Sequence, residues 1–283
     1  MSDYALQADN LCKDYGSFKL KNVSFALPKG YIMGFIGPNG AGKSTTISIL
    51  LDRIRPRRGK ACIFGYETAA LPSELKEEIG LVLDECNFAP VLTWPQVGRF
   101  MAGLYKKWDR EAFRNKCRQA GLDPKKKIRT YSKGMKMKLA LAAATSHSAK
   151  LLILDEATSG LDPVAREDVL DMLLDFVSDG EGSVLVSSHI LSDLEKVCDY
   201  ITFIKDGSIV FSREKDYLYE KYGILRCANH EFAALGGRGV IAHRTTNFGT
   251  ERLVIKDMMP EGYTTEKAEI EDIMVYYSRG DRE

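Results

Sequence analysis

The eight residues from Gly37 to Ser44 constrain the fold of this chain more than any other part of its sequence. They read GPNGAGKS and fit the pattern GxxxxGK[ST], with an apolar run before them and a helical pattern after them. Glycines let the backbone curl so that successive N–H groups point inward at phosphate oxygens, and the following helix adds the positive end of its dipole. The segment therefore predicts a strand, a phosphate-binding loop and a helix, in that order.

The loop predicts a nucleotide site that also holds Mg²⁺. Lys43 supplies a point charge for the β and γ phosphates, and Ser44 offers a hydroxyl to the metal ion. The residues expected to contact the nucleotide are Gly37, Pro38, Asn39, Gly40, Ala41, Gly42, Lys43, Ser44 and Thr45.

Two adjacent carboxylates, Asp155 and Glu156, follow the apolar run at residues 151–154. Ligands of parallel sheets bind at the carboxyl ends of the strands, so Asp155 is expected to reach the Mg²⁺ held by Ser44. Adjacent strand residues point to opposite faces, so Glu156 has a different role. We expect Glu156 to orient or deprotonate the water that attacks the γ-phosphate. The alternative is a solvated Asp-Glu turn, which is common where no phosphate loop is present.

Short apolar runs alternate with helical patterns along the chain, which indicates an α/β fold with a sheet covered on both faces. The segment from about residue 85 to 148 reads as a helical insertion, KDGSIVF as a hairpin, and residues 265–277 as a last helix. Strands are expected at residues 31–36, 81–83, 151–154, 184–186 and 201–204, and helices at 42–52 and 164–176.

Residues 125–138 read KKKIRTYSKGMKMK and raise the question of a nucleic-acid partner. The formal net charge of the chain is only +1, however, and a dedicated nucleic-acid binder usually carries a clear basic excess. We therefore expect no nucleic-acid partner. The six cysteines are scattered, which favours reduced thiols in a cytosolic protein, and no apolar run approaches the roughly 20 residues that span a bilayer.

Four further motifs resemble the ATPase subunits of ABC transporters in their order and spacing. YSKGM at residues 131–135 resembles the LSGGQ signature, and SGLD at residues 159–162 resembles the D-loop. His189 falls at the switch histidine, and Tyr15 falls where the family stacks an aromatic ring on adenine. The set covers about residues 8 to 211 and is most similar to single-domain bacterial subunits that serve exporter-type permeases.

The resemblance implies a P-loop NTPase of the RecA-like type, with an ABC ATPase domain at residues 1–213 and an accessory extension at residues 214–283. It also implies hydrolysis of ATP to ADP and phosphate in a head-to-tail dimer, either of identical chains or with a related subunit. Ser132 and Gly134 would bind the γ-phosphate of ATP held by the partner, and His189 would act beside Glu156. The other implied partner is an integral-membrane permease, which would hold the chain at the cytoplasmic face of the membrane.

Three positions depart from the family pattern. Lys133 replaces the first signature glycine, and Met135 replaces the signature glutamine. Asp84 stands where the family usually has a glutamine that binds Mg²⁺, so Asp84 is expected to be a metal ligand, with Glu85 as the alternative. These departures leave two other functions open: a non-transport ABC ATPase, and a regulatory module that uses ATP as a switch with little hydrolysis.

Five aromatic residues of the helical insertion have two possible roles. They could line a groove for a helix of the permease, or they could pack the core of the insertion itself. These residues are Phe88, Trp94, Phe100, Tyr105 and Trp108.

Overall fold

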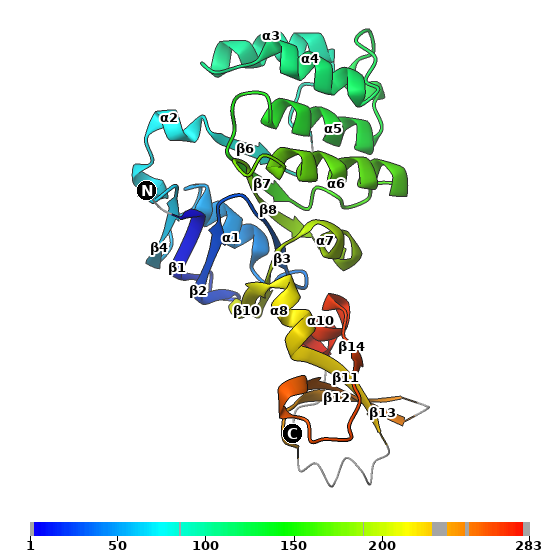
Figure 1. The fold of residues 1–283 in the computed structure, drawn as a ribbon. Helices are drawn as coiled ribbons and strands as arrows, with labels where there is room; N and C mark the ends of the chain where they lie inside the picture. Colours follow the sequence, from blue (N-terminus) through cyan, green and yellow to red (C-terminus); the bar gives the residue numbers. More distant parts are fainter. Residues whose placement is uncertain (1–2, 85, 189, 228–236, 247–248, 280–283) are drawn as a thin grey trace. The chain divides into compact units, whose positions relative to one another are not determined.

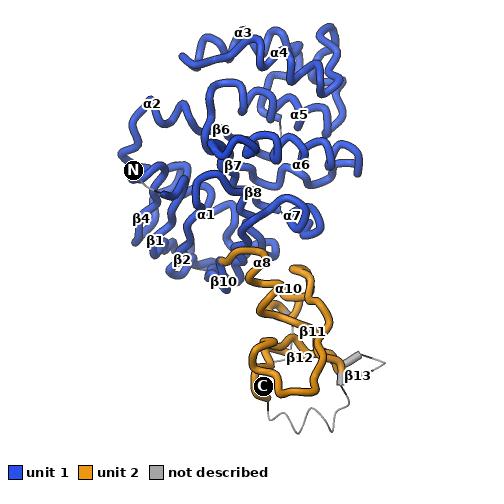
Figure 2. The backbone as a smooth tube through the Cα atoms, in the orientation of Figure 1, with its two compact units in different colours: residues 1–212 blue, residues 213–283 orange. Residues whose placement is uncertain are grey.

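The computed structural model describes residues 3–84, 86–188, 190–227, 237–246 and 249–279. The chain divides into two compact units, residues 1–212 and residues 213–283, which Figure 2 shows in blue and orange. No helix in the described ranges is long and apolar enough to cross a lipid bilayer.

The first unit is built around a six-stranded sheet with the strand order β10-β9-β3-β8-β7-β6, of which the strands from β9 to β6 run parallel. Strands β3, β7 and β8 are buried along almost their whole length, as expected for parallel strands covered on both faces. A two-residue turn, Asp206-Gly207, leads from β9 to β10. The strands are β3 (Ile32–Ile36), β6 (Ile79–Val82), β7 (Leu151–Asp155), β8 (Ser183–Ser188), β9 (Tyr200–Lys205) and β10 (Ser208–Glu214).

A second, four-stranded antiparallel sheet with the order β2-β1-β4-β5 belongs to the same unit. Helix α1 (Lys43–Leu50) shares one hydrophobic core with strands of both sheets, and it contributes Ile47, Ile49 and Leu50 to that core. The strands are β1 (Tyr4–Asp14), β2 (Lys19–Pro28), β4 (Arg58–Ile63) and β5 (Tyr66–Glu67). Short helices follow at Thr68–Ala70 and at α2 (Ser73–Lys76).

The helical insertion lies between β6 and β7 and has a hydrophobic core of its own. It consists of α3 (Trp94–Leu104), α4 (Arg110–Gln119), a 3₁₀ turn (Ile128–Thr130) and α5 (Lys133–Ala144). Figure 1 shows α3 and α4 as the outermost layer, with α5 between them and α6 (Pro163–Val177). Helix α7 (Leu191–Val197) packs on α6 and β3.

Four of the five aromatic residues of the insertion belong to this helical core. Trp94 is buried, with its ring centroid 5.9 Å from that of Phe113 in an edge-on arrangement. Phe88, Tyr105 and Trp108 are partly buried and pack against the same core. Phe100 differs, because 59% of its surface is exposed.

The second unit is a small α/β unit with an antiparallel sheet in the order β12-β13-β11-β14. The last helix starts at Ile270, so the expected start near residue 265 is wrong. The reason is that Glu266 and Lys267 pair with β11 as a short strand instead of continuing the helix. The elements are α8 (Lys215–Lys221), β11 (Tyr222–Cys227), β12 (Val240–Thr246), β13 (Gly249–Ile255), a 3₁₀ turn (Lys256–Met258), β14 (Glu266–Lys267) and α10 (Ile270–Arg279).

Candidate nucleotide-binding site

The loop between β3 and α1 has a backbone path that requires two of its glycines. A Cβ atom at Gly37 would lie 2.3 Å from the carbonyl oxygen of Ile204, and Gly42 has a φ of 114°. Residues other than glycine rarely adopt that φ. A Cβ at Gly42 would also lie 2.9 Å from the Phe18 ring. Between these two fixed points the loop exposes Pro38, Asn39 and Gly40. Ser44 is exposed as well, Thr45 is half-buried and Ala41 is buried.

Lys43 lies under this loop with only 6% of its surface exposed. Its Nζ donates a hydrogen bond to the Gly37 carbonyl at 2.8 Å, so the side chain curls back along the loop. The same Nζ lies 3.4 Å from Oε1 of Glu156. The phosphate-loop lysine and the second carboxylate of β7 therefore meet, although they are more than a hundred residues apart in the sequence.

Ser187 of the neighbouring strand β8 binds the Asp155 carboxylate and the Glu156 backbone at the end of β7. The Ser187 hydroxyl donates to Oδ1 of Asp155 at 2.5 Å, and the Glu156 N–H donates to both the carbonyl and the hydroxyl oxygen of Ser187. Glu156 has a φ of 56°, in the left-handed region that L-residues adopt at turns. The strand therefore ends at Glu156, whose side chain reaches Lys43.

The oxygen ligands beside the loop suit Mg²⁺. The hydroxyl of Ser44 is exposed and the carboxylate of Asp155 is half-buried, and both are hard oxygen donors of the kind Mg²⁺ prefers. Among the described residues, no group of three or more His, Cys, Asp and Glu side chains is placed to hold a metal ion. A Mg²⁺ ion at this place would need phosphate oxygens and waters to complete its shell, which is the usual arrangement for Mg²⁺ with nucleotides.

Tyr15 lies in the turn that follows β1 and is 48% exposed. Its ring is 5.5 Å from Nζ of Lys13, and its N–H donates to the carbonyl of Phe18. Phe18, from the same turn, is the residue that approaches Gly42. The turn thus borders the phosphate loop through Phe18, a contact that the sequence did not suggest.

The segment that resembles the signature begins α5. Ser132 is the N-cap of this helix, and its side chain accepts a hydrogen bond from the Met135 N–H at 3.2 Å. Gly134 is buried, and a Cβ there would lie 2.4 Å from the Cβ of Ala165 on α6. Asp162 caps α6 in turn by accepting from the Ala165 N–H at 2.9 Å. The first turns of the two helices therefore pack against each other through a small residue on each side.

Lys133 and Asp84 form an ion pair that the sequence did not predict. Nζ of Lys133 lies 2.6 Å from Oδ1 of Asp84, and the two side chains are 42% and 53% exposed. The pair connects the start of α5 to the loop after β6, and Lys133 also passes within 3.6 Å of the position that a Cβ of Gly160 would take. Met135 packs against the helical core instead of reaching out as a glutamine would. Glu85 and His189 lie outside the described residues.

Comparison with known proteins identifies the family of this chain. The ABC transporter family profile matches residues 20–159. The linearmycin resistance ATP-binding protein of Bacillus subtilis is 35% identical over 77% of this chain and 72% of its own length. The lantibiotic transport ATP-binding protein of Streptococcus pyogenes is 35% identical over 75% of this chain and 91% of its own. The bacitracin transport ATP-binding protein of Bacillus licheniformis is 32% identical, over 76% and 72%.

Solved structures agree with these relatives. An ATP-binding subunit of an ABC transporter superposes with a TM-score of 0.67 and 28% identity, covering 76% of this chain and 91% of that one. A dimeric cassette bound to ADP and phosphate superposes with a TM-score of 0.64 at 24% identity over 74% and 98%, which supports the fold.

The chain belongs to the ABC transporter family of ATP-binding proteins. Its fold is that of an ABC ATPase cassette, as the motifs predicted. It is an ATP-binding subunit of an ABC transporter and an ATPase.

Proposed function

We propose that this chain hydrolyses Mg·ATP and uses the cycle to drive an export permease. The observation that carries the proposal is the convergence of Lys43, from the phosphate loop, with Glu156, from the end of β7, at 3.4 Å. A phosphate-binding cation and a carboxylate that can act as a base are thereby placed in one site. The names of the relatives, which include bacitracin and lantibiotic transport and linearmycin resistance, support export of antibiotics or peptides.

Each side chain has a distinct part in the reaction. The loop N–H groups and Lys43 bind the β and γ phosphates, while Tyr15 stacks on the adenine ring. Mg²⁺, held by Ser44 and Asp155, would neutralise the charge on the phosphate oxygens. Glu156 orients the attacking water and accepts its proton at a carboxylate oxygen. His189 donates a hydrogen bond to the γ-phosphate and loses it on release.

The signature segment completes the site of a second subunit. Ser132 and the N–H of Gly134 stand at the first turn of α5, where helix N–H groups favour an anion. In a head-to-tail dimer they bind the γ-phosphate of the partner's ATP. Because this contact is made only when ATP is present, nucleotide shifts the pair toward the closed state. Hydrolysis removes the γ-phosphate and returns the two subunits to the open state. This cycle takes place at the cytoplasmic face of the membrane that holds the permease.

Asp84 is the third proposed Mg²⁺ ligand, and it is paired with Lys133 in this structure. Asp84 would hold Mg²⁺ only after Lys133 releases it, which would link metal binding to the position of the signature helix. A module that uses ATP as a switch with little hydrolysis would keep the Lys133–Asp84 ion pair intact. The rate of phosphate release therefore separates the two functions.

Light scattering of the Glu156→Gln protein, with and without Mg·ATP, tests the proposal. We expect this variant to bind ATP and lose turnover, and to change from monomer to dimer only with ATP if two identical chains form the sites. Lys43→Ala serves as the control, since it should lose tight ATP binding. A monomer in both conditions, with ATP binding shown separately, would mean that the pair needs the permease or a related subunit. Wild-type turnover in Glu156→Gln would remove Glu156 from its role.

A further inference from the structure

The helical insertion carries a strong positive charge that the rest of the chain balances. Residues 86–131 contain eleven Lys and Arg against three Asp and Glu, a net charge of +8, whereas the whole chain has +1. Within the described ranges, Lys107 is the one cation of these eleven with a carboxylate oxygen within 4.0 Å. Ion pairs among the described residues therefore compensate little of the positive charge of residues 86–131.

The cations of α4 and of the loop after it are on the surface. Arg110, Arg114 and Arg118 recur every four residues and are all exposed, while Phe113 and Cys117 form the buried face. Side chains spaced by four on a helix form one row. Three more exposed cations, Lys125, Lys126 and Lys127, follow in the loop.

Apolar side chains lie on the exposed face of the neighbouring helix α3. Phe100 and Leu104 are also four residues apart, and they are 59% and 58% exposed. They lie at the edge of the face that buries Val97 and Met101 in the helical core, where the helix meets solvent. Helices α3 and α4 contact each other, for example through Trp94 and Phe113, so the apolar row and the arginine row occupy one outer layer.

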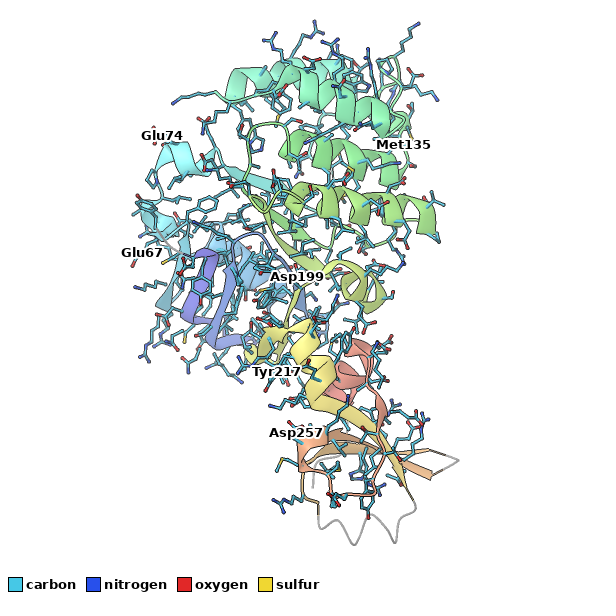
Figure 3. The ribbon with its side chains drawn as sticks, in the orientation of Figure 1. Glu67, Glu74, Met135, Asp199, Tyr217 and Asp257 are labelled. Atoms are coloured by element: carbon cyan, nitrogen blue, oxygen red, sulfur yellow. The ribbon has the colours of Figure 1, made fainter. Side chains whose placement is uncertain are left out.

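A second contact between apolar and basic residues is fixed by the backbone. The Ile128 N–H donates to the carbonyl of Leu92, and the Arg129 N–H donates to the carbonyl of Pro90. Exposed Arg129 is thereby held beside Val91, which is 59% exposed and lies three residues before the start of α3. Figure 3 shows nitrogen-tipped side chains projecting outward from this end of the molecule.

We propose that this basic–apolar surface, formed by Val91, Phe100 and Leu104 with the Arg110–Arg114–Arg118 row and residues 125–129, binds a bilayer that contains anionic lipids. The cations would contact phosphate groups of the lipid headgroups, and the three apolar side chains would enter the boundary between headgroups and acyl chains. A nucleic acid would also attract the cations, but it offers no apolar layer for exposed Phe100 and Leu104. The inference does not depend on the ATPase cycle proposed above.

Flotation of the purified full chain with lipid vesicles tests this surface. We expect binding to vesicles with about 30% phosphatidylglycerol, weak binding to pure phosphatidylcholine, and loss of binding as salt rises. At roughly a fivefold effect per cation, Arg110→Gln/Arg114→Gln/Arg118→Gln should lower the partition coefficient on the order of a hundredfold. Phe100→Ser/Leu104→Ser should lower it about tenfold.

Control variants remove three arginines or one exposed leucine elsewhere on the chain. Arg53→Gln/Arg55→Gln/Arg58→Gln removes three exposed arginines near β4, and Leu174→Ser removes an exposed leucine of α6. Both should bind vesicles as the wild type does, and all variants should keep wild-type ATP binding. Equal losses from the two arginine triples would overturn the proposal, as would failure of the wild type to bind anionic vesicles. Equal binding to heparin and to vesicles, with no effect of Phe100→Ser/Leu104→Ser, would assign the surface to soluble polyanions instead.

Discussion

Ser187 connects the two acidic residues of the proposed site, because its hydroxyl donates to the Asp155 carboxylate and accepts from the backbone N–H of Glu156. We predict that Ser187→Ala lowers the rate of ATP hydrolysis about tenfold, which corresponds to about 1.4 kcal/mol. The variant removes the hydrogen bond that orients the Asp155 carboxylate. It also removes one of the two hydrogen bonds that the Glu156 N–H makes to Ser187. Steady-state phosphate release measures the change.

Thr202→Val is a suitable comparison for Ser187→Ala. Thr202 is equally buried, and its hydroxyl is also hydrogen-bonded, but it lies on β9 with Met33 and Ser212 as partners. Both variants should melt at lower temperature because each loses a buried hydrogen bond. Only Ser187→Ala should lose turnover, and equal rates in the two variants would make the role of Ser187 purely structural.

The ion pair of Lys133 and Asp84 predicts a change in the Mg²⁺ requirement. Both side chains are largely exposed, so Lys133→Ala should alter the free energy of unfolding by less than about 1 kcal/mol. It should, however, free Asp84 to serve as a ligand and lower the Mg²⁺ concentration for half-maximal hydrolysis by up to about fivefold, because breaking the pair releases at most about 1 kcal/mol.

A double-mutant cycle checks the cause of that change. In an Asp84→Asn background, Lys133→Ala should no longer shift the Mg²⁺ titration, because the carboxylate that it releases is gone. The same shift in both backgrounds would show that Lys133 acts on the metal site by some route other than Asp84.

The residues of this site differ in how far the sequence could predict them. Two short patterns predict four of the site residues. The phosphate-loop motif contains Lys43 and Ser44, and the end of the apolar run at residues 151–154 is followed by Asp155 and Glu156. Ser187 could not be predicted, because a serine in a buried strand has no pattern, and it becomes informative only through the register that pairs it with Asp155. The Lys133–Asp84 pair likewise joins residues far apart in the chain.

His147 links the end of the helical insertion to the segments around it. It follows α5, is 1% exposed, stacks on Tyr105 with ring centroids 4.0 Å apart, and has its Nδ1 2.8 Å from the carbonyl oxygen of Glu77. Burial lowers the pKa of His147 in the folded protein. The unfolded chain, with an ordinary histidine pKa of about 6.5, therefore binds a proton more readily than the folded one.

This difference predicts acid sensitivity of the fold. The stabilisation from neutral His147 should be fully present above about pH 6.5 and should be lost as the pH falls toward the lower folded pKa. Urea unfolding of wild type and His147→Gln between about pH 5 and 8 measures it. The variant should be less stable than the wild type at pH 8, and the difference should narrow with acid. A difference that is constant with pH would contradict the prediction.

The parallel strands were easier to predict than the antiparallel ones, for a physical reason. Strands β3, β7 and β8 are buried on both faces, so they read as uninterrupted apolar runs. Strand β1 has a mixed pattern of burial with three irregularities in its pairing to β2, and this hides its periodicity. The antiparallel sheet of the first unit was missed for that reason, although its β1 and β2 enclose the turn that carries Tyr15.

Surface properties of the whole chain were the least accessible from its sequence. The net charge of +1 conceals the +8 of residues 86–131. The lysines of the basic stretch at residues 125–138 also differ in their surroundings. Lys133 and Lys138 are held by carboxylates, whereas Lys125, Lys126 and Lys127 are exposed in a loop. Only the fold separates these two groups.

The two compact units predict that the ATPase part folds without the C-terminal extension. The first unit contains both large hydrophobic clusters and every described residue of the proposed nucleotide site. We propose that the boundary lies near residue 213. A chain ending at Glu214, which keeps all of β10, should bind ATP with a dissociation constant within about twofold of the full chain.

Scanning calorimetry of the two proteins distinguishes independent units from a single cooperative fold. The second unit has about seventy residues, and such a small domain buries a smaller share of its surface than a larger one. The full chain should therefore show an additional transition at lower temperature, and the chain ending at Glu214 should keep only the transition that ATP raises. A single ATP-sensitive transition in the full chain, with weak ATP binding by the shorter one, would mean that the extension is needed to fold the ATPase.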